Sequence, residues 1–399
     1  MHNSRTLLIA AATGLTMIAA TAANAEDIKV GLVLGFTGPT ESVSPIYAKS
    51  AEIAVEEINK SGLLLGGSKI VTVRGDSTCI DASAATAAAE RQVTSDKVSA
   101  ILGADCSGVT TAIVNNVTTP NGVVMISPSA TSPSLTAIKD NDYFFRTAPS
   151  DARLGVVITQ ILMDRGIKKV AVTYSNSDYG KGMTDSFSRA YEAAGGVITI
   201  NAPHEDGKGD YSAEVAALAG AGGELLVVFG YGDQGGLGVV RQAIESGAFS
   251  KFAFGDGMYY QSVLDAIGSE LGGTIGAVAW SEGKGAEAFA TAAKAVGIDP
   301  EAAYLRESYD AMALIAFAMQ KAGSTDRTAI RDAVMSVANA PGTQILPGEL
   351  AKGLQILKDG GDIDYVGATN VEFTKEGDVT GTYREWEIKD GKFTTVKIR

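Results

Sequence analysis

The chain has 399 residues, of which 45% are hydrophobic, 20% charged and 7% aromatic. This apolar content excludes a disordered chain, and the length allows two or more lobes that each bury a core. Acidic residues outnumber basic ones by 46 to 33, and no run of Lys and Arg interrupts the excess of negative charge. Because such a chain repels phosphate, nucleic acid is excluded as a partner.

The first 25 residues predict a secretory signal peptide. Arg5 gives a basic start, an apolar run extends from Leu7 to Ala20, and Ala23-Asn24-Ala25 is a small-x-small cleavage pattern. The run is too short for a membrane anchor, which needs about 20 apolar residues. We expect cleavage after Ala25 and a periplasmic location, because no other segment approaches spanning length.

From Ile28 onward, short apolar runs alternate with amphipathic stretches. The predicted strands are Ile28–Leu34, Ile70–Val73, Ala100–Leu102, Lys169–Thr173, Val197–Ile200, Leu225–Phe229 and Phe252–Phe254, and the first predicted helices are Ile46–Ile58 and Ala82–Val93. A repeated strand–helix order is typical of a mostly parallel sheet covered on both faces. Because the pattern restarts near Arg165, we predict an α/β protein of two doubly wound parallel-sheet lobes.

In the last part of the chain, helices are followed by strands. The predicted helices are Glu287–Ala295, Ala302–Lys321, Arg327–Ala338 and Leu350–Leu357, and the strand-like runs are Val366–Phe373, Tyr383–Ile388 and Phe393–Ile398. This order indicates that the chain returns to sheets begun earlier. We expect lobe 1 to comprise residues 26–147 plus about 281–362, and lobe 2 residues 148–280 plus about 363–399.

Cys79 and Cys106 are the only cysteines. An exported protein meets oxidising conditions, which favour a disulfide between them over two independent buried thiols. Such a bond would close a loop of about 27 residues.

The residues of the main catalytic and metal-binding motifs are missing. After cleavage of the signal peptide a single histidine, His204, remains in a polar stretch where we expect a solvated loop. One histidine and two paired cysteines do not make a metal site, and no nucleophile elbow or P-loop is present. The sequence therefore predicts no catalytic residue, no metal and no enzyme activity.

One glycine-rich string resembles a dinucleotide fingerprint. Gly230-Tyr231-Gly232-Asp233-Gln234-Gly235 lies between a predicted strand and a helix, and Asp256 follows about twenty residues later. However, Asp233 would place a carboxylate beside the pyrophosphate, and an exported protein has little access to nicotinamide cofactors. We therefore expect no cofactor.

Small, hydroxyl-rich strings follow the predicted strands. They are Gly35–Pro39, Gly103–Ser107 and Ser127–Pro133 in the first half, and Ser177–Gly180, Gly230–Tyr231 and Gly255–Gly257 in the second. In open α/β sheets, ligands bind beyond the carboxyl ends of the strands. We expect the strand ends of the two lobes to face each other, and this arrangement predicts a cleft for a small anionic or zwitterionic ligand.

These strings resemble a known family over nearly the whole mature chain. The chain resembles type I periplasmic solute-binding proteins of the leucine/isoleucine/valine-binding class. The segments that carry this resemblance are the opening Gly35-Phe36-Thr37-Gly38-Pro39, the predicted helical segment Ala54–Asn59, and the strings Gly103–Ser107, Ser127–Thr131 and Asp178–Gly182. The resemblance implies two lobes joined by a multi-crossover hinge, and it implies a disulfide where the two cysteines lie. It also implies a monomeric receptor that captures an amino acid, branched-chain or similar, and delivers it to the membrane permease of an ABC importer.

The resemblance implies three ligand contacts from the first lobe. A serine matching Ser107 and nearby backbone N–H groups hold the ligand carboxylate, whereas the carbonyl of Ser129 and the hydroxyl of Thr131 hold the ligand amine. Hydroxyl groups suit both tasks because they donate and accept. The structural alternatives are a helix N-cap for Ser107 and turn residues for Ser129 and Thr131.

The second lobe contributes three more ligand contacts by the same resemblance. Asp256 matches an acid that binds the amine, and Tyr179 and Tyr231 match tyrosines that close over the ligand. A carboxylate suits a cation because it only accepts hydrogen bonds. The alternatives are a turn between two glycines for Asp256 and ordinary packing for the tyrosines.

Two departures from the family leave the ligand open. The family's acid at the position of Asp256 is usually a glutamate, and the position near Val43, often aromatic in relatives, has no aromatic here. The alternative function keeps the binding fold but takes an amine-free ligand, such as an aromatic or other carboxylic acid, an amide or urea.

Overall fold

The structure is a computed structural model that describes residues 27–399, and the predicted signal peptide lies outside these described residues. Within them the strands form two large, parallel-rich sheets and one small one. The first large sheet has the order β2-β1-β3-β4-β5, and every neighbouring pair in it is parallel. Its strands are β1 (Asp27–Leu34), β2 (Lys69–Asp76), β3 (Ala100–Gly103), β4 (Val124–Ser127) and β5 (Phe144–Arg146).

The second large sheet has the order β14-β13-β10-β9-β8-β6-β7. Its strands are β6 (Lys169–Ser175), β7 (Val197–His204), β8 (Leu225–Phe229), β9 (Phe252–Phe254), β10 (Ile275–Trp280), β13 (Thr382–Lys389) and β14 (Lys392–Ile398). The pairs of β10 with β13 and of β13 with β14 are antiparallel, whereas the other pairs are parallel. The end of the chain thus completes a sheet begun in its middle, as the sequence predicted.

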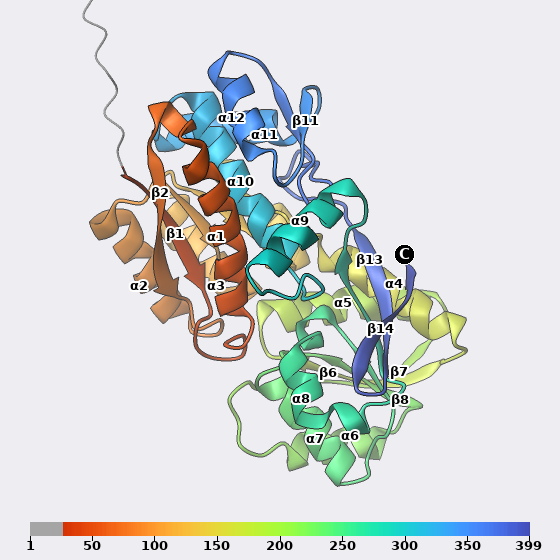
Figure 1. Cartoon of the computed structure of the whole chain (residues 1–399). Coiled ribbons are helices and arrows are strands. Elements are labelled where there is room, and N and C mark those ends of the chain that lie inside the picture. Colours follow the sequence, from red (N-terminus) through yellow and green to blue (C-terminus); the bar gives the residue numbers. More distant parts are fainter. Residues whose placement is uncertain (1–26) are drawn as a thin grey trace, which may run out of the picture.

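Helices cover both large sheets. Those that follow strands of the first sheet are α1 (Ser44–Ser61), α2 (Ala82–Arg91) and α3 (Ser107–Ile113), and those that follow strands of the second are α5 (Asp178–Ala193), α6 (Ser212–Ala221), α7 (Gly235–Glu245) and α8 (Gln261–Ile267). The others are α4 (Asp151–Asp164), α9 (Lys284–Ala295), α10 (Leu305–Ala322), α11 (Arg327–Ala338) and α12 (Leu350–Lys358). Figure 1 shows α1–α3 and α10–α12 in the upper half of the molecule and α6–α8 with β6–β8 in the lower half. The molecule is therefore an α/β protein with two parallel-rich sheets.

The hydrophobic pattern explains this arrangement. β3, β4 and β8 are buried at every position, as expected for central strands with helices on both faces. By contrast, β14 lies at the edge of its sheet, and most of its side chains are exposed. The apolar runs predicted as strands at Ala100–Leu102 and Leu225–Phe229 are thus confirmed as β3 and β8.

One predicted strand is wrong. Val366–Phe373 forms no strand, and only β12 (Ile363–Tyr365) precedes it, paired with β11 (Thr343–Ile345). The buried carboxyl group of Asp310 accepts hydrogen bonds from the backbone N–H groups of Ala368 and Thr369, both at 2.9 Å. Because these N–H groups donate to Asp310 in a turn, they do not form the hydrogen bonds of a β-sheet. The apolar residues around them nevertheless have a strand-like pattern.

The chain passes between the two sheets three times in the described residues. The first two passages lie between β5 and α4 and between β10 and α9, and there we keep the proposed lobe boundaries near 147 and 281. For the third we propose a position between Asp378 and Thr382 rather than near Asp362, because Asp378 is ion-paired with Arg146 of β5 whereas Thr382 begins β13. These lobe boundaries remain our proposal.

The predicted disulfide between Cys79 and Cys106 is confirmed, with 5.2 Å between the Cα atoms. It connects the loop before α2 to the residue before α3, and both cysteines are buried. Replacing both by Ser should lower the free energy of unfolding by about 3–4 kcal/mol, because the unfolded chain loses a constraint on its entropy. Urea unfolding measures this loss, and wild-type protein under reducing conditions should reproduce it. A loss below about 1 kcal/mol would contradict the prediction.

Candidate functional site

The carboxyl ends of the strands in both sheets meet at one small cavity, with a volume of about 20 Å³. Thirteen residues line it: Thr40, Tyr47, Asp105, Cys106, Ser107, Ser129, Thr131, Tyr179, Tyr231, Asp256, Gly257, Tyr260 and Tyr304. All six ligand-contact residues predicted from the sequence are among them. Parallel strands explain this result, because their carboxyl ends meet at one edge of each sheet.

The first-sheet side of the cavity carries three hydroxyl residues in fixed positions. Ser107 is the first residue of α3, and its Oγ accepts a hydrogen bond from the backbone N–H of Ser132 at 3.1 Å. The Ser129 hydroxyl donates to the carbonyl of Asp105 at 3.0 Å, and the Thr131 carbonyl accepts from the N–H of Asp151. The N-cap alternative for Ser107 is wrong, because Cys106 is the N-cap of α3.

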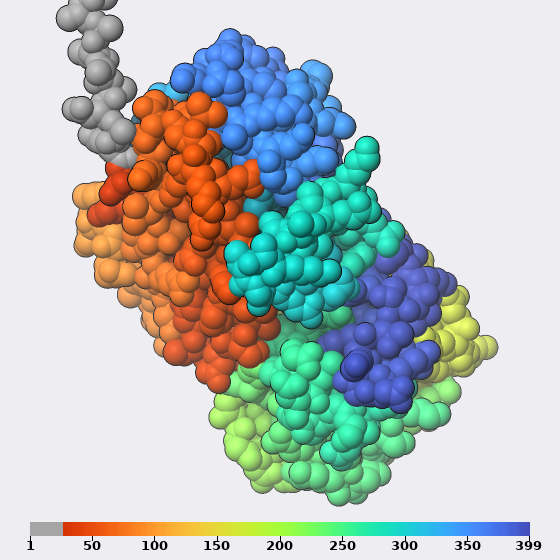
Figure 2. Space-filling view, in the orientation of Figure 1, coloured from red at the N-terminus to blue at the C-terminus, as the bar shows by residue number. Residues whose placement is uncertain are grey.

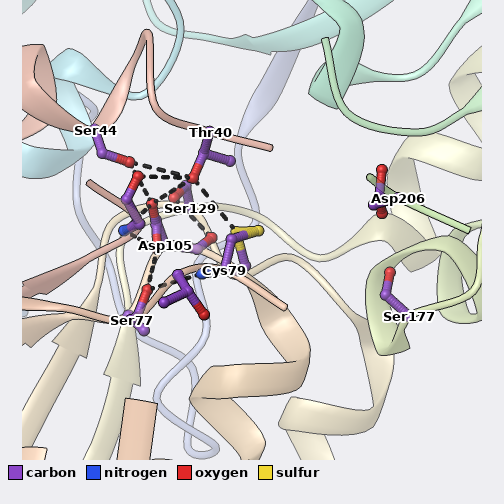
Figure 3. Close-up of a disulfide and its surroundings, with 12 residues drawn as sticks. Thr40, Ser44, Ser77, Cys79, Asp105, Ser129, Ser177 and Asp206 are labelled. Carbon is purple, nitrogen blue, oxygen red and sulfur yellow. Dashed lines mark hydrogen bonds between the residues drawn. A yellow bond between two sulfur atoms is a disulfide. The ribbon is translucent and has the colours of Figure 1, made fainter. Parts of the chain in front are cut away.

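Asp105, which the sequence analysis missed, organises the loops on this side. Its buried carboxyl group accepts from the Gly35 N–H at 2.9 and 3.0 Å, from Ser44 Oγ at 2.7 Å, and from the hydroxyls of Thr40 and Ser77. Figure 3 shows these hydroxyls around Asp105, close to the disulfide. Burial raises the pKa of Asp105, and the donors act in the opposite direction. With so many partners inside the protein, Asp105 holds the Gly35 loop in place; its only sequence signal was its position at a strand end.

On the second-sheet side, Asp256 lies directly beyond β9 in a short 3-10 turn, η5 (Asp256–Met258), and is 2% exposed. Its Oδ1 accepts from the Tyr179 hydroxyl at 2.8 Å, and its Oδ2 accepts from the Tyr304 hydroxyl. The Tyr179 hydroxyl in turn accepts from the N–H of Gly257 at 3.2 Å. Burial raises the pKa of Asp256 above the usual aspartate range, and the two tyrosine hydroxyls oppose that shift.

Five tyrosines surround the cavity, of which only Tyr179 and Tyr231 were predicted. The rings of these two lie with their centroids 5.1 Å apart, and the rings of Tyr47 and Tyr304 meet edge to face at 6.4 Å. Burial raises the pKa of all five tyrosines well above 10, so their hydroxyls remain donors at neutral pH. Tyr47 lies one helical turn after Val43 and supplies an aromatic ring to the cavity from α1.

His204 is not the solvated loop residue that the sequence indicated. It is the last residue of β7 and is 1% exposed, with Nδ1 at 2.9 Å from the Thr173 hydroxyl. Burial lowers its pKa to about 4, so the ring is neutral at pH 7. The strand continues three residues beyond the polar Asn201, and this extension places the histidine in the interior.

The glycine-rich string after β8 serves a contact between the two sheets. Ser42, from the loop between β1 and α1, donates its N–H and its hydroxyl to the Asp233 carboxylate, both at 2.8 Å. The Ser262 hydroxyl donates to the same carboxylate at 2.6 Å. Asp233 therefore satisfies protein donors from both sides, and Figure 2 shows the segment near residue 40 against the green lower half of the molecule.

Within residues 27–399, no group of three or more His, Cys, Asp or Glu side chains is arranged to hold a metal ion. In the same part of the chain, no helix combines the length and the apolar character that crossing a membrane requires.

A buried cavity lined by polar and aromatic side chains, between two α/β halves, is typical of proteins that enclose a small solute. The sequence profile of the family described as periplasmic binding protein matches residues 27–351. The chain is also 33% identical over 330 residues to Leu/Ile/Val-binding protein homolog 3 of Brucella melitensis. This alignment covers 81% of this chain and 86% of the relative. The chain belongs to the periplasmic binding protein family, whose members are solute-binding proteins and not enzymes.

Solved structures share this type I periplasmic binding protein fold. One is the substrate-binding protein of a branched-chain amino acid transporter from Streptococcus pneumoniae in complex with isoleucine, with a TM-score of 0.77, 26% identity and coverage of 94% of this chain and 99% of that one. Another is a solute-binding protein of an ABC transporter from R. palustris in complex with benzoate, with a TM-score of 0.75, 19% identity and coverage of 93% and 96%. The two complexes hold ligands of different chemistry.

Proposed function

We propose that this protein is the solute receptor of an ABC importer and that it encloses an α-amino acid, branched-chain or similar, in the cavity between its two lobes. The isoleucine complex of a 26% identical transporter protein supports an amino-acid ligand, and the relative's name supports the same class. Delivery to a membrane permease, a periplasmic location and a monomeric state follow from this role. The signal-peptide pattern of the first 25 residues supports export.

The cavity offers different groups to the two ends of an amino acid. The hydroxyl of Ser107 and neighbouring backbone N–H groups suit the ligand carboxylate, since both donate hydrogen bonds. The ligand ammonium only donates hydrogen bonds, and the Ser129 carbonyl, the Thr131 hydroxyl and the Asp256 carboxylate are acceptors available to it. Tyr179 and Tyr231 close over the ligand from the second lobe.

The observation that carries this proposal is the position of Asp256. A carboxyl group buried at the cavity wall, with both oxygens directed to tyrosine hydroxyls, marks one end of the cavity as a site for positive charge. Burying a charge is costly unless it is paired, so an ammonium group is the natural partner.

A thermal-shift screen of amino acids, organic acids and amides tests the proposal. A ligand that binds only the folded protein stabilises it by about 2.7 kcal/mol at a hundredfold excess over its Kd, enough to raise Tm by several degrees. We expect the largest shifts from amino acids with aliphatic side chains. A large shift with an amine-free acid and none with any amino acid would contradict an amino-acid ligand.

The alternative is an aromatic carboxylic acid. The benzoate complex shares the fold, and five tyrosine rings line the cavity. However, a carboxylic acid would place a further negative charge near Asp256, which disfavours it. Benzoate and 4-hydroxybenzoate therefore belong in the same screen.

Asp233 is expected to hold the closed form, in which Ser42 from the first lobe reaches it. Asp233→Ala should weaken binding of L-leucine by about fivefold to about 150-fold, because the two lost hydrogen bonds from Ser42 are each worth about 0.5–1.5 kcal/mol net, about 1–3 kcal/mol together. Titration calorimetry measures the affinity, and solution scattering should show a larger radius of gyration at equal leucine concentration. The control is Glu245→Gln, an exposed charge change on α7. Unchanged affinity and radius would refute the prediction.

A further inference from the structure

A second buried carboxyl group belongs to a residue that contacts the cavity-lining Thr131, and it has no hydrogen-bond partner among the described residues. Asp151, the first residue of α4, is 0% exposed, and neither of its carboxylate oxygens makes a hydrogen bond to any of residues 27–399. The Thr131 hydroxyl is near enough to lower the pKa of Asp151, although it does not reach hydrogen-bond geometry. A buried carboxyl group without a partner is costly, and evolution rarely retains one without a use.

The helix itself does not require this acid. Ser150 is the N-cap of α4, and its hydroxyl already accepts from the N–H of Ala152 at 3.3 Å. A negative charge in the first turn favours a helix, but an exposed acid provides that effect without the cost of burial. The position of Asp151 therefore needs another explanation.

Its surroundings connect Asp151 to the ammonium end of the cavity. Its backbone N–H donates at 2.9 Å to the carbonyl of Thr131, a residue of the cavity wall. The titratable and charged groups that interact with its carboxyl group are Asp256, Tyr179, Tyr304, Tyr383 and Arg146. Burial and the charge of Asp256 raise the pKa of Asp151, whereas Arg146 opposes the shift. Arg146 is itself paired with Asp378, so two acids share this region without a free cation from the described residues.

We propose that Asp151 is a second carboxylate for the ligand's ammonium group, acting together with Asp256, and that this pair restricts the site to solutes with a cationic nitrogen. This inference rests on the proposed function and makes it narrower. An ammonium group placed near both acids relieves their repulsion and satisfies the unpartnered oxygens of Asp151. An amine-free acid adds a third negative charge and leaves Asp151 without a partner.

The test is a thermodynamic cycle that compares binding of a ligand with and without its amino group, each to the wild type and to Asp151→Asn. Calorimetry compares L-leucine with 4-methylpentanoate, its amine-free analogue, and L-alanine with propionate. We expect Asp151→Asn to weaken binding of the amino acid about tenfold or more, because a buried partner of its charge is lost, and to leave or improve binding of the amine-free acid. Asp185→Asn, an exposed change of the same charge on α5, should alter neither.

The outcomes separate this inference from the proposed function. If the wild type binds an amino acid and Asp151→Asn changes its affinity by less than about twofold, or weakens both ligands equally, the inference is overturned while the function stands. If the wild type binds only amine-free acids, both are overturned.

Two further measurements keep the inference testable. A raised pKa means that the ligand-free protein loses stability as pH rises from the usual aspartate range through the raised value. Asp151→Asn should reduce this loss, so its Tm relative to the wild type should rise between pH 4 and pH 7. If the variant does not fold, proton release decides: leucine binding should still release protons in Asp256→Asn, from Asp151, and complete loss of release in that variant would overturn the inference.

Discussion

Asp256→Ala is expected to weaken amino-acid binding about thirtyfold to several thousandfold. The change leaves a buried ligand ammonium without its carboxylate, which costs roughly 2–5 kcal/mol, and each 1.4 kcal/mol is tenfold in Kd. The fold should survive, because Asp256 lies at the cavity wall between two glycines and contributes little to the core. Titration calorimetry with L-leucine measures the affinity, and circular dichroism checks the fold.

Asp256→Asn provides the matched comparison. The amide oxygen can still accept from one of the hydroxyls of Tyr179 and Tyr304, but the amide lacks the charge, so the loss of affinity should be smaller than with Ala. If Asp256→Ala bound its amino acid within about threefold of the wild type, less than 1 kcal/mol, Asp256 would be a turn residue and the ammonium would lie elsewhere.

Arg146→Ala is expected to destabilise the protein by about 3–5 kcal/mol, because it leaves the Asp378 carboxylate without its partner in a buried place. The guanidinium of Arg146 is fully buried and bonds both oxygens of Asp378, at 2.6 and 2.9 Å. It also donates to the carbonyls of Ala130 and Ser132, at 3.1 and 2.8 Å. These carbonyls flank Thr131 in the cavity wall, so the same change should weaken ligand binding.

A double variant separates these two effects. Arg146→Met with Asp378→Leu removes both charges and should recover much of the stability, since apolar residues often replace a buried ion pair without loss. It should not recover the affinity for leucine, because the carbonyls of Ala130 and Ser132 still lack their donor. Urea unfolding and calorimetry measure the two quantities. Full recovery of affinity would show that Arg146 does not position the loop.

Much of the fold was predictable because its signals are local. Strands such as Ala100–Leu102 and Leu225–Phe229 are buried on both faces, and their consecutive apolar residues indicate this burial directly in the sequence. The strand ends followed from the same runs, and with them the loops that carry Ser107 and Thr131. The strand pattern placed Asp256 in a string beyond a strand, and the resemblance to the family singled it out within that string.

The errors came from residues whose environment depends on distant segments. The apolar pattern of Val366–Phe373 indicated a strand, but a buried carboxyl group on α10 binds its backbone and forms a turn. The polar neighbours of His204 indicated solvent, but the strand continued and the histidine became buried. In each case tertiary contacts overrode the local pattern.

The sequence by itself determined two parallel-rich sheets, the cysteine pair and six residues at the strand ends, because burial, export and chain direction act on neighbouring residues. Only the tertiary structure decided which groups from distant segments complete the cavity. Tyr304 donates to Asp256 from 48 residues away, and Asp151 lies near enough that burial and the charge of Asp256 together raise its pKa. These residues stand at helix starts with no local mark of their role, since their proximity arises from packing the two halves together.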